Sequence, residues 1–353
     1  MGTRRRVIVG VDTHAAMHCA VVLDGTGRML ATREFDASAR GYCSLLTWAR
    51  RFGCLEAAGV EGTGAYGAGL ARQLIAEGVK VFEVPRPDRR LRRTRGKSDP
   101  IDAEAAARAV LAGTATVAPK IADGPIEAIR SLHVAKLGAI KARTAATNTL
   151  RSIILTAPES LRAQLPSSGL PNKVINACVR LRADPTRLSE PVQATKAALR
   201  SVALRAKSLR EEIQLLEHQL AELVAITAPT TLATFAMGVD TTSALLVTVG
   251  DNPERLRSEA AFARLCGVAP LPASSGKTNR HRLHRGGDRS ANRALHVAVI
   301  VRMRYCSRTR AYVARRTSQG LSKPEIIRCL KRYLAREIFQ ALRADYAALN
   351  HPA

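Results

Sequence analysis

The sequence lacks the features that mark several common protein classes. Only 4% of its 353 residues are aromatic, so its cores must be built from aliphatic side chains. No apolar run approaches the ~20 residues that a membrane span requires. The seven cysteines are scattered without a Cys-x-x-Cys pair, which argues against zinc sites and disulfides. We therefore expect a cytoplasmic protein whose cysteines are reduced and mostly buried, with no membrane association.

Acidic residues are also scarce. The chain carries 55 Lys and Arg against 29 Asp and Glu, a net charge of +26, with a pI near 10.9. Its hydrophobic content of 46% is normal, so the charge points to a polyanionic partner such as nucleic acid. A GC-rich genome, whose proteins are rich in arginine, would explain part of the excess. It would not explain the clustering of the charge near the C-terminus.

The first part of the chain alternates short apolar runs with helical patterns. Two apolar runs flank the polar Asp12-Thr-His, and a third follows the turn DGTGR. Further on, the pattern predicts helices at 40–52 and 69–77 and strands at 55–60 and 79–84. This order, which ends in a helix bearing acids, is the one expected of a ribonuclease-H-like sheet. In such a sheet Asp12 lies on the first strand and Glu61, at the tip of the fourth, comes alongside it.

The acidic helix lies in the segment GKSDPIDAEAAARAVLAG (96–113). Pro100 fits the first helical position, and the Ala-rich run that follows is a strong helix former. Asp99 and Asp102 then project from one end and roughly one face of the helix. Helix capping explains both acids as well, with Asp99 as the N-cap and Asp102 as a first-turn acid favoured by the helix dipole.

Two further acids favour a metal site over capping. Asp12 follows the apolar VIVGV directly, where a carboxylate is costly to bury unless a cation or hydrogen bonds satisfy it. The alternatives are a turn aspartate for Asp12 and a solvated loop acid for Glu61. Four carboxylates at strand ends and a helix start, in so basic a protein, suit two Mg²⁺ ions. Such a pair of ions catalyses in-line phosphoryl transfer.

The middle of the chain is helical. Helical spacing runs through 126–155, where Thr144 and Asn148 stand beside cations and are able to touch a sugar–phosphate backbone. A seam of alternating three- and four-residue steps then extends over more than four heptads: Val192, Thr195, Leu199, Val202, Ala206, Leu209, Ile213, Leu216, Leu220 and Leu223. A helix packed within its own chain, a coiled-coil hairpin and a subunit contact all explain this seam. We favour a dimer-forming arm.

Two helices are expected before the last loop. Residues 232–249 contain a turn followed by an apolar helix, and 253–266 reads as an amphipathic helix stopped at Gly267. Together they resemble a helix-hairpin-helix unit, which presents backbone N–H groups to a DNA phosphate. A plain helical hairpin accounts for them equally well.

The loop at 267–296 is a second chemical centre, rich in Pro, Gly, Ser and Arg. From 275 to 343 there are 18 Lys and Arg against 3 Asp and Glu, the pattern of a surface that holds a phosphate backbone. Ser275 is a hydroxyl among cations, which is the setting of a nucleophile for phosphoryl transfer, although a spacer explains it too. His281 and His284 are available as donors or phosphate contacts. We expect nucleic-acid contacts from Lys277, Arg280, Arg282, Arg285, Arg289 and Arg293.

Several motifs of the chain resemble one family. GVDTH with Asp12, VEGTGAYG with Glu61 and KSDPIDAEAAA with Asp99 and Asp102 are similar to the DEDD transposases of bacterial insertion sequences, the Piv/MooV-like, bridge-RNA-guided recombinases. KARTAATNTLRSIILTAPESLR and LCGVAPLPASSGKTNRHRLHRGGDRSANRALH match further. The resemblance covers about 6–165 and 232–343, and the four acids with the serine loop, in this order, make it specific.

The resemblance implies a fold of α/β plus α class. Its parts are a RuvC-like N-terminal domain (1–120) whose carboxylates bind Mg²⁺, a helical linker and coiled-coil arm (121–230), and a mainly helical C-terminal transposase domain (231–353). The nucleophile maps to Ser275, with Ser274 adjacent. In this family the serine forms a covalent 5′-phosphoserine link with DNA and frees a 3′-hydroxyl. The loop GGDRSANRALH departs from the family pattern, so the roles of Asp288 and Asn292 are not given by it.

The partners implied are donor and target DNA, a structured bridge RNA and further copies of the chain, as a dimer or tetramer joined through the coiled coil, acting at the nucleoid. Because the metal and the serine lie in separate domains, we expect an assembly to bring them together. One alternative is a RuvC-type junction nuclease that uses metal-activated water. The other is a non-catalytic nucleic-acid-binding protein, in which the acids are caps.

Overall fold

The structure, a computed structural model, describes residues 5–84, 98–166, 171–252, 255–274, 281–282 and 284–350. The chain forms two compact units. The N-terminal unit comprises Met1–Gly124 with Val249–Arg255, and the C-terminal unit comprises Pro125–Thr248 with Leu256–Ala353. The division into three domains at 120 and 230 stays a prediction.

The N-terminal unit is built on a five-stranded mixed sheet. The strands are β1 (Arg6–Thr13), β2 (Met17–Asp24), β3 (Met29–Asp36), β4 (Cys54–Glu61) and β5 (Lys80–Val84), in the spatial order β3-β2-β1-β4-β5. β1, β2 and β3 are antiparallel neighbours, whereas β4 runs parallel to β1 and β5 parallel to β4. The predicted sequence of strands and helices in this unit is confirmed.

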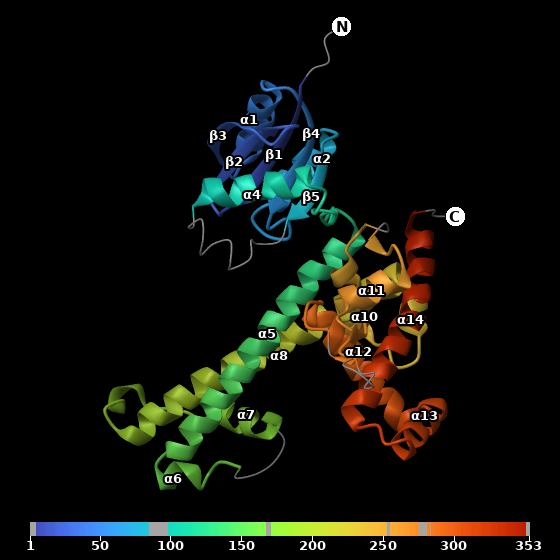
Figure 1. Cartoon of the computed structure of the whole chain (residues 1–353). Coiled ribbons are helices and arrows are strands. Elements are labelled where there is room, and N and C mark those ends of the chain that lie inside the picture. Colours follow the sequence, from blue (N-terminus) through green and yellow to red (C-terminus); the bar gives the residue numbers. More distant parts are fainter. Residues whose placement is uncertain are drawn as a thin grey trace. The chain divides into compact units, whose positions relative to one another are not determined.

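Alternating residues of β1 send side chains into two separate cores. Val7, Val9 and Val11 belong to a core formed with α1 (Ala39–Arg50) and α2 (Ala68–Ala76). Ile8 packs on the opposite face with Ala103 and Ala107 of α4 (Asp99–Leu111). The sheet is therefore a middle layer, with α1 and α2 on one face and α4 across the other (Figure 1).

Two glycines allow α4 to lie directly on the sheet. A Cβ atom at Gly10 of β1 would fall 2.0 Å from the carbonyl oxygen of Ala103, and one at Gly59 of β4 would fall 2.6 Å from that of Ala106. Only glycine permits so close an approach of helix and strand backbones. The N-cap of α4 is Ser98, so the expectations that Asp99 is the cap and that Pro100 is the first helical residue are wrong by one position.

The C-terminal unit is helical and is built around two long helices, α5 (Pro125–Thr156) and α8 (Pro191–Thr227). They run antiparallel, because Lys136 of α5 meets Glu217 of α8 while Leu150 shares a core with Leu199. Leu199, Val202 and Ala206 of the seam thus pack in a core with α5 and α7 (Pro171–Arg180) of the same chain. The seam is buried by an intrachain helical pair, and the predicted dimer contact stays a prediction.

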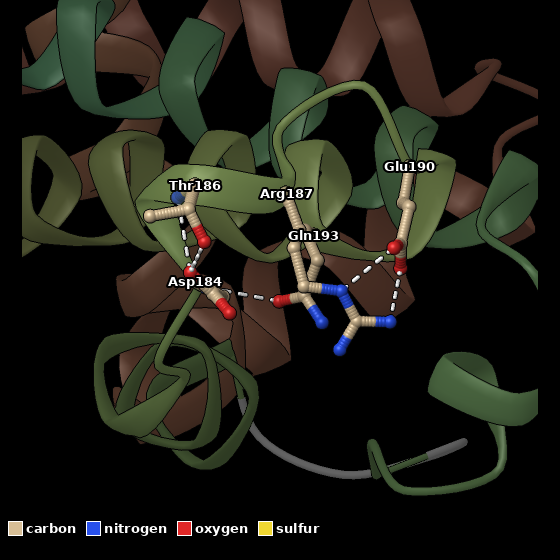
Figure 2. A network of polar contacts seen from close by, with 5 residues as sticks. All are labelled: Asp184, Thr186, Arg187, Glu190 and Gln193. Atoms are coloured by element: carbon tan, nitrogen blue, oxygen red, sulfur yellow. Dashed lines mark hydrogen bonds and ion pairs between the residues drawn. The ribbon is translucent and has the colours of Figure 1, made fainter.

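A polar turn fixes the connection between α7 and α8 (Figure 2). The Asp184 carboxylate accepts hydrogen bonds from the backbone N–H of Thr186 at 3.0 Å and from its hydroxyl at 2.7 Å, and these bonds hold the pKa of Asp184 below its usual value. Arg187 binds both carboxylate oxygens of Glu190, at 2.7 and 3.0 Å, just before α8 begins. The Asp184 backbone N–H donates to Gln193 in the first turn of α8.

The rest of the unit consists of shorter elements around one long helix. They are α6 (Glu159–Arg162), a 3₁₀ turn (Pro185–Arg187), α9 (Pro229–Ala233), α10 (Val239–Val249), α11 (Glu259–Leu265), β6 (Leu271–Pro272), β7 (His281–Arg282), α12 (Arg289–Tyr305), α13 (Ser307–Ser318) and α14 (Lys323–Asn350). The helix expected at 253–266 is shorter, because Ser258 caps α11 through the Ala261 N–H. Among the described helices, none has the length and apolarity to cross a membrane.

Candidate active site

The ends of β1 and β4 bring two predicted site residues onto neighbouring strands. The parallel register pairs Val11 with Val60, so Asp12 and Glu61 follow at the same level, on the face that α4 covers. Both side chains are buried. The hydroxyl of Thr13 donates a 2.8 Å hydrogen bond to the Glu61 carbonyl oxygen, which ties the two strand ends together.

The first turn of α4 supplies the other two acids. Asp99 and Asp102 are three residues apart and lie on one side of the helix. Asp102 is only 6% exposed, whereas the side chain of Asp99 is 47% exposed. Because Gly10 and Gly59 seat α4 on the sheet, this turn reaches the end of β1, where the charges of Asp99 and Asp102 act on Asp12. The carboxylates of Asp99 and Asp102 therefore interact electrostatically with that of Asp12.

A histidine that the sequence analysis did not assign to the site joins these acids. The Nε2 atom of His14 lies 3.3 Å from Oδ2 of Asp12 and 3.4 Å from Oδ1 of Asp99. One ligand atom from each of these three residues lies within 4.8 Å of the others, which is close enough to hold one metal ion. The signal was present in GVDTH, because residues two apart at a strand end point to the same side.

The electrostatics of the cluster favour a bound cation. Burial raises the pKa of Asp12; His14 opposes this increase, and the neighbouring carboxylates of Asp99 and Asp102 add to it. An ionised Asp12 is thus costly as the site stands, and a divalent cation would remove that cost. Carboxylate oxygens with one imidazole form a donor set that suits a divalent cation.

The serine loop begins and ends in a two-stranded hairpin of the C-terminal unit. Leu271 of β6 pairs with Arg282 of β7, and Pro272 with His281. Ser275, Lys277 and Arg280 lie outside the described residues. Ser274 is exposed. The remaining predicted nucleic-acid contacts are also exposed, as expected for phosphate-binding cations: Arg282, Arg285, Arg289 and Arg293.

A cavity of about 590 Å³ adjoins this hairpin. His281 and Arg282 of β7 line it together with cations of α13 and α14 that the sequence analysis did not single out: Arg316, Arg328, Lys331 and Arg332. Burial lowers the pKa of Lys331, whose ammonium donates to Oδ1 of Asn292 at 2.9 Å. These cations line one cavity because α13 and α14 pack beside the hairpin. A local pattern in the sequence does not predict this packing.

Two polar residues of the loop have structural roles. Asn292 donates from Nδ2 to the carbonyl oxygens of Cys266 and Gly267, at 3.1 and 2.9 Å. Asp288 caps α12 by accepting from the backbone N–H groups of Ser290 and Ala291, at 2.7 and 2.9 Å. Both side chains hold the loop onto the helices that flank the cavity.

The N-terminal unit thus has an acidic cluster that could hold a metal ion, and the C-terminal unit has a cationic cavity whose charge suits phosphate groups. Comparison with known proteins identifies the family. A family described as "Transposase", of the DEDD type, matches residues 9–157, and the "Transposase IS116/IS110/IS902 family" matches residues 232–314. Together the two segments cover more than half of the chain. The protein therefore belongs to the IS110 family of DEDD transposases.

One relative is an insertion element IS110 uncharacterized 43.6 kDa protein of Streptomyces coelicolor. It is 31% identical to this chain over 147 residues, which are 40% of this chain and 36% of the relative. The aligned part of the chain thus spans little more than a third of the length of that relative.

Proposed function

We propose that this protein is an RNA-guided transposase, a recombinase that cuts and rejoins DNA strands through a serine nucleophile assisted by a divalent-metal carboxylate site. The observation that carries the proposal is the meeting of Asp12, His14 and Asp99 at the end of β1, beside the buried Asp102. Family membership supplies the reaction class, because a transposase acts on DNA phosphodiesters.

The fold of the N-terminal unit supports a ribonuclease-H/RuvC-like assignment. Three antiparallel strands are followed by two parallel ones in the order β3-β2-β1-β4-β5, and an acidic helix covers one face. In such a sheet the neighbouring ends of two parallel strands carry the catalytic carboxylates. Asp12 and Glu61 occupy this position.

Asp12, Asp99 and His14 would hold one divalent ion, and Glu61 and Asp102 stand nearby to complete the DEDD set. A bound ion would supply Lewis-acid stabilisation of the charge that develops on phosphoryl oxygens. The chain's own contribution is to orient the ligands. The Nε2 atom of His14 lies beside the carboxylates of Asp12 and Asp99, and α4, seated on Gly10 and Gly59, presents its first turn to the sheet.

The nucleophile in this proposal is Ser275, with Ser274 as the neighbouring candidate. Its hydroxyl oxygen attacks the phosphorus of a DNA phosphodiester while its proton passes to a base. The bond from phosphorus to the 3′-oxygen breaks, and that oxygen leaves as a 3′-hydroxyl after protonation. The 5′-phosphate stays on the serine until a second 3′-hydroxyl displaces it. Exposed cations around the hairpin, among them Arg282 and Arg285, would hold the strand.

The carboxylates and the serine belong to different compact units. We propose that assembly of a dimer or tetramer on donor and target DNA, guided by a structured bridge RNA at the nucleoid, brings both parts to one scissile phosphate. The net charge of +26 is consistent with holding two nucleic acids at once.

The test is a search for a covalent protein–DNA adduct. Purified protein, Mg²⁺ or Mn²⁺, RNA from the element's flanks and labelled junction DNA are mixed and separated on a denaturing gel. We expect a retarded band that disappears after protease treatment. The band should be absent with Ser275→Ala and should remain with Ser274→Ala. If the band is absent only with Ser274→Ala, the nucleophile is Ser274 and not Ser275.

The carboxylate cluster by itself also suits a metal-dependent junction nuclease, and the same experiment separates the two functions. Cleaved DNA without an adduct, unchanged in Ser275→Ala, would establish hydrolysis by metal-activated water. Cleavage that persists undiminished in Asp102→Asn would refute the metal site in both.

A further inference from the structure

A second polar cavity lies in the helical part of the C-terminal unit, at neither of the sites described above. It has a volume of about 370 Å³, within the range of ligand pockets. Three helices that are distant in the sequence line it, namely α5, α7 and α8.

The cavity has an apolar floor and a polar rim. Ile175 and Ala206 form the floor and are buried parts of the core that joins the three helices. On α5, Thr144, Thr147 and Arg151 follow helical steps of three and four, so they make one polar stripe facing the cavity.

The lining of this cavity is positively charged. Four of its lining residues are cations, and none is acidic. Within the described part of the chain, Arg143, Arg151 and Arg210 form no ion pair, and the only pair of Lys207 is a distant one, 3.9 Å from exposed Glu211. The Nε atom of Arg210 is buried and has no hydrogen-bond partner. Such a concentration of positive charge is unfavourable until an anion enters.

We propose that this cavity binds the phosphodiester backbone of a nucleic-acid strand. A guanidinium group can donate two parallel hydrogen bonds to phosphate oxygens, and three arginines line this cavity. Amides from Asn148, Asn172 and Asn176 both donate and accept, which suits sugar hydroxyls and base edges next to a phosphate. The site is independent of the carboxylate cluster and of the serine, so it retains its ligand when catalysis is absent.

The test compares two triple variants of the full-length protein. The cavity variant is Arg143→Gln, Arg151→Gln and Arg210→Gln. The matched control is Lys141→Gln, Lys173→Gln and Arg205→Gln. It removes the same charge from exposed positions of α5, α7 and α8 that do not line the cavity. Binding to labelled 20-nucleotide single strands of RNA and DNA of one sequence is measured by fluorescence anisotropy in EDTA, over a range of salt concentrations.

We expect the cavity variant to bind the labelled strands at least tenfold more weakly than the wild-type protein does. The slope of log K against log salt concentration should also become shallower by about two units, because ~0.7 counterion is released per contacted phosphate and three cations are removed. The control should keep the wild-type slope. An equal loss of affinity for RNA and DNA assigns the contact to phosphate alone. A larger loss of affinity for RNA would show that the cavity also contacts the 2′-hydroxyl.

Equal weakening of both variants would overturn the proposal, because the effect would then be diffuse charge. Unchanged binding of the cavity variant would overturn it as well. Arg151→Gln alone, at an exposed position, is the second variant if the triple change lowers the yield of folded protein, and it should lose about threefold or more in affinity. Circular dichroism verifies the fold, and no result depends on cleavage activity.

Discussion

Gly10 of β1 lies against the backbone of Ala103 in α4, so closely that a Cβ on Gly10 would stand 2.0 Å from the Ala103 carbonyl oxygen. This contact sets the height of α4 above the sheet, and α4 carries Asp99 and Asp102. The geometry of the acidic cluster thus depends on a glycine that has no functional group.

Gly10→Ala should therefore damage the site without touching an acid. Forcing a methyl group into backbone contact lowers the free energy of unfolding by at least about 1–3 kcal/mol and displaces α4. We expect a lower midpoint in thermal denaturation and weaker stabilisation by Mg²⁺ or Mn²⁺. Gly25→Ala is the control, because a Cβ there meets nothing within 4 Å. A Gly10→Ala protein with wild-type metal response would contradict this dependence.

Asp12→Asn should stabilise the metal-free protein. Burial raises the pKa of Asp12 above its usual 3.8, so the folded state holds the proton to higher pH than the unfolded state does. Stability is therefore lost as the pH rises through this window, and the ionised carboxylate remains a cost at neutral pH. In EDTA at pH 7 the variant should melt a few degrees higher than the wild type, a difference that vanishes below pH 3.8.

The same variant should lose the stabilisation that metal provides. Adding Mg²⁺ or Mn²⁺ should raise the melting temperature of the wild type and leave Asp12→Asn unchanged, as measured by differential scanning fluorimetry. Asp36→Asn, at an exposed strand end, controls for the loss of one charge. A metal response equal in both proteins would show that Asp12 is not a ligand.

Lys136 gives an asymmetric prediction. Its side chain is 3% exposed, and its ammonium lies 2.5 Å from an oxygen of Asp240 and 3.1 Å from one of Glu217, whose side chains are largely exposed. Lys136→Met frees two carboxylates that water can solvate, so stability should change by no more than about 1 kcal/mol. The double change Glu217→Gln and Asp240→Asn leaves a buried ammonium without a counter-charge and should cost about 3 kcal/mol. Urea denaturation of the three proteins measures both effects, and equal costs would contradict the prediction.

Glu259 links α11 to α14 and should contribute to acid sensitivity. Hydrogen bonds from Arg336 and Arg332, at 2.9 and 2.6 Å, hold the pKa of Glu259 below its usual 4.5. A depressed acid pKa contributes stability above pH 4.5 that is lost as the pH falls below it. Glu259→Gln should thus melt lower at pH 7, and its stability should fall less steeply below pH 4.5. Glu211→Gln, whose ion pair is long and exposed, should follow the wild-type curve.

Local patterns of the sequence determined the elements of the fold. The short apolar run VIVGV predicted β1, the Ala-rich run predicted α4, and the seam predicted α8, because these patterns are properties of neighbouring residues. The motifs around the four acids also sufficed to indicate the family, which the comparisons confirm.

Only the tertiary structure decided which residues meet. It placed His14 between Asp12 and Asp99, and it covered the seam of α8 with α5 of the same chain. It also brought Arg143, Asn176 and Arg210 to one cavity from three separate helices. A periodic pattern states that a face will be buried but not by which partner, since the partner is chosen by the packing of segments far apart along the chain.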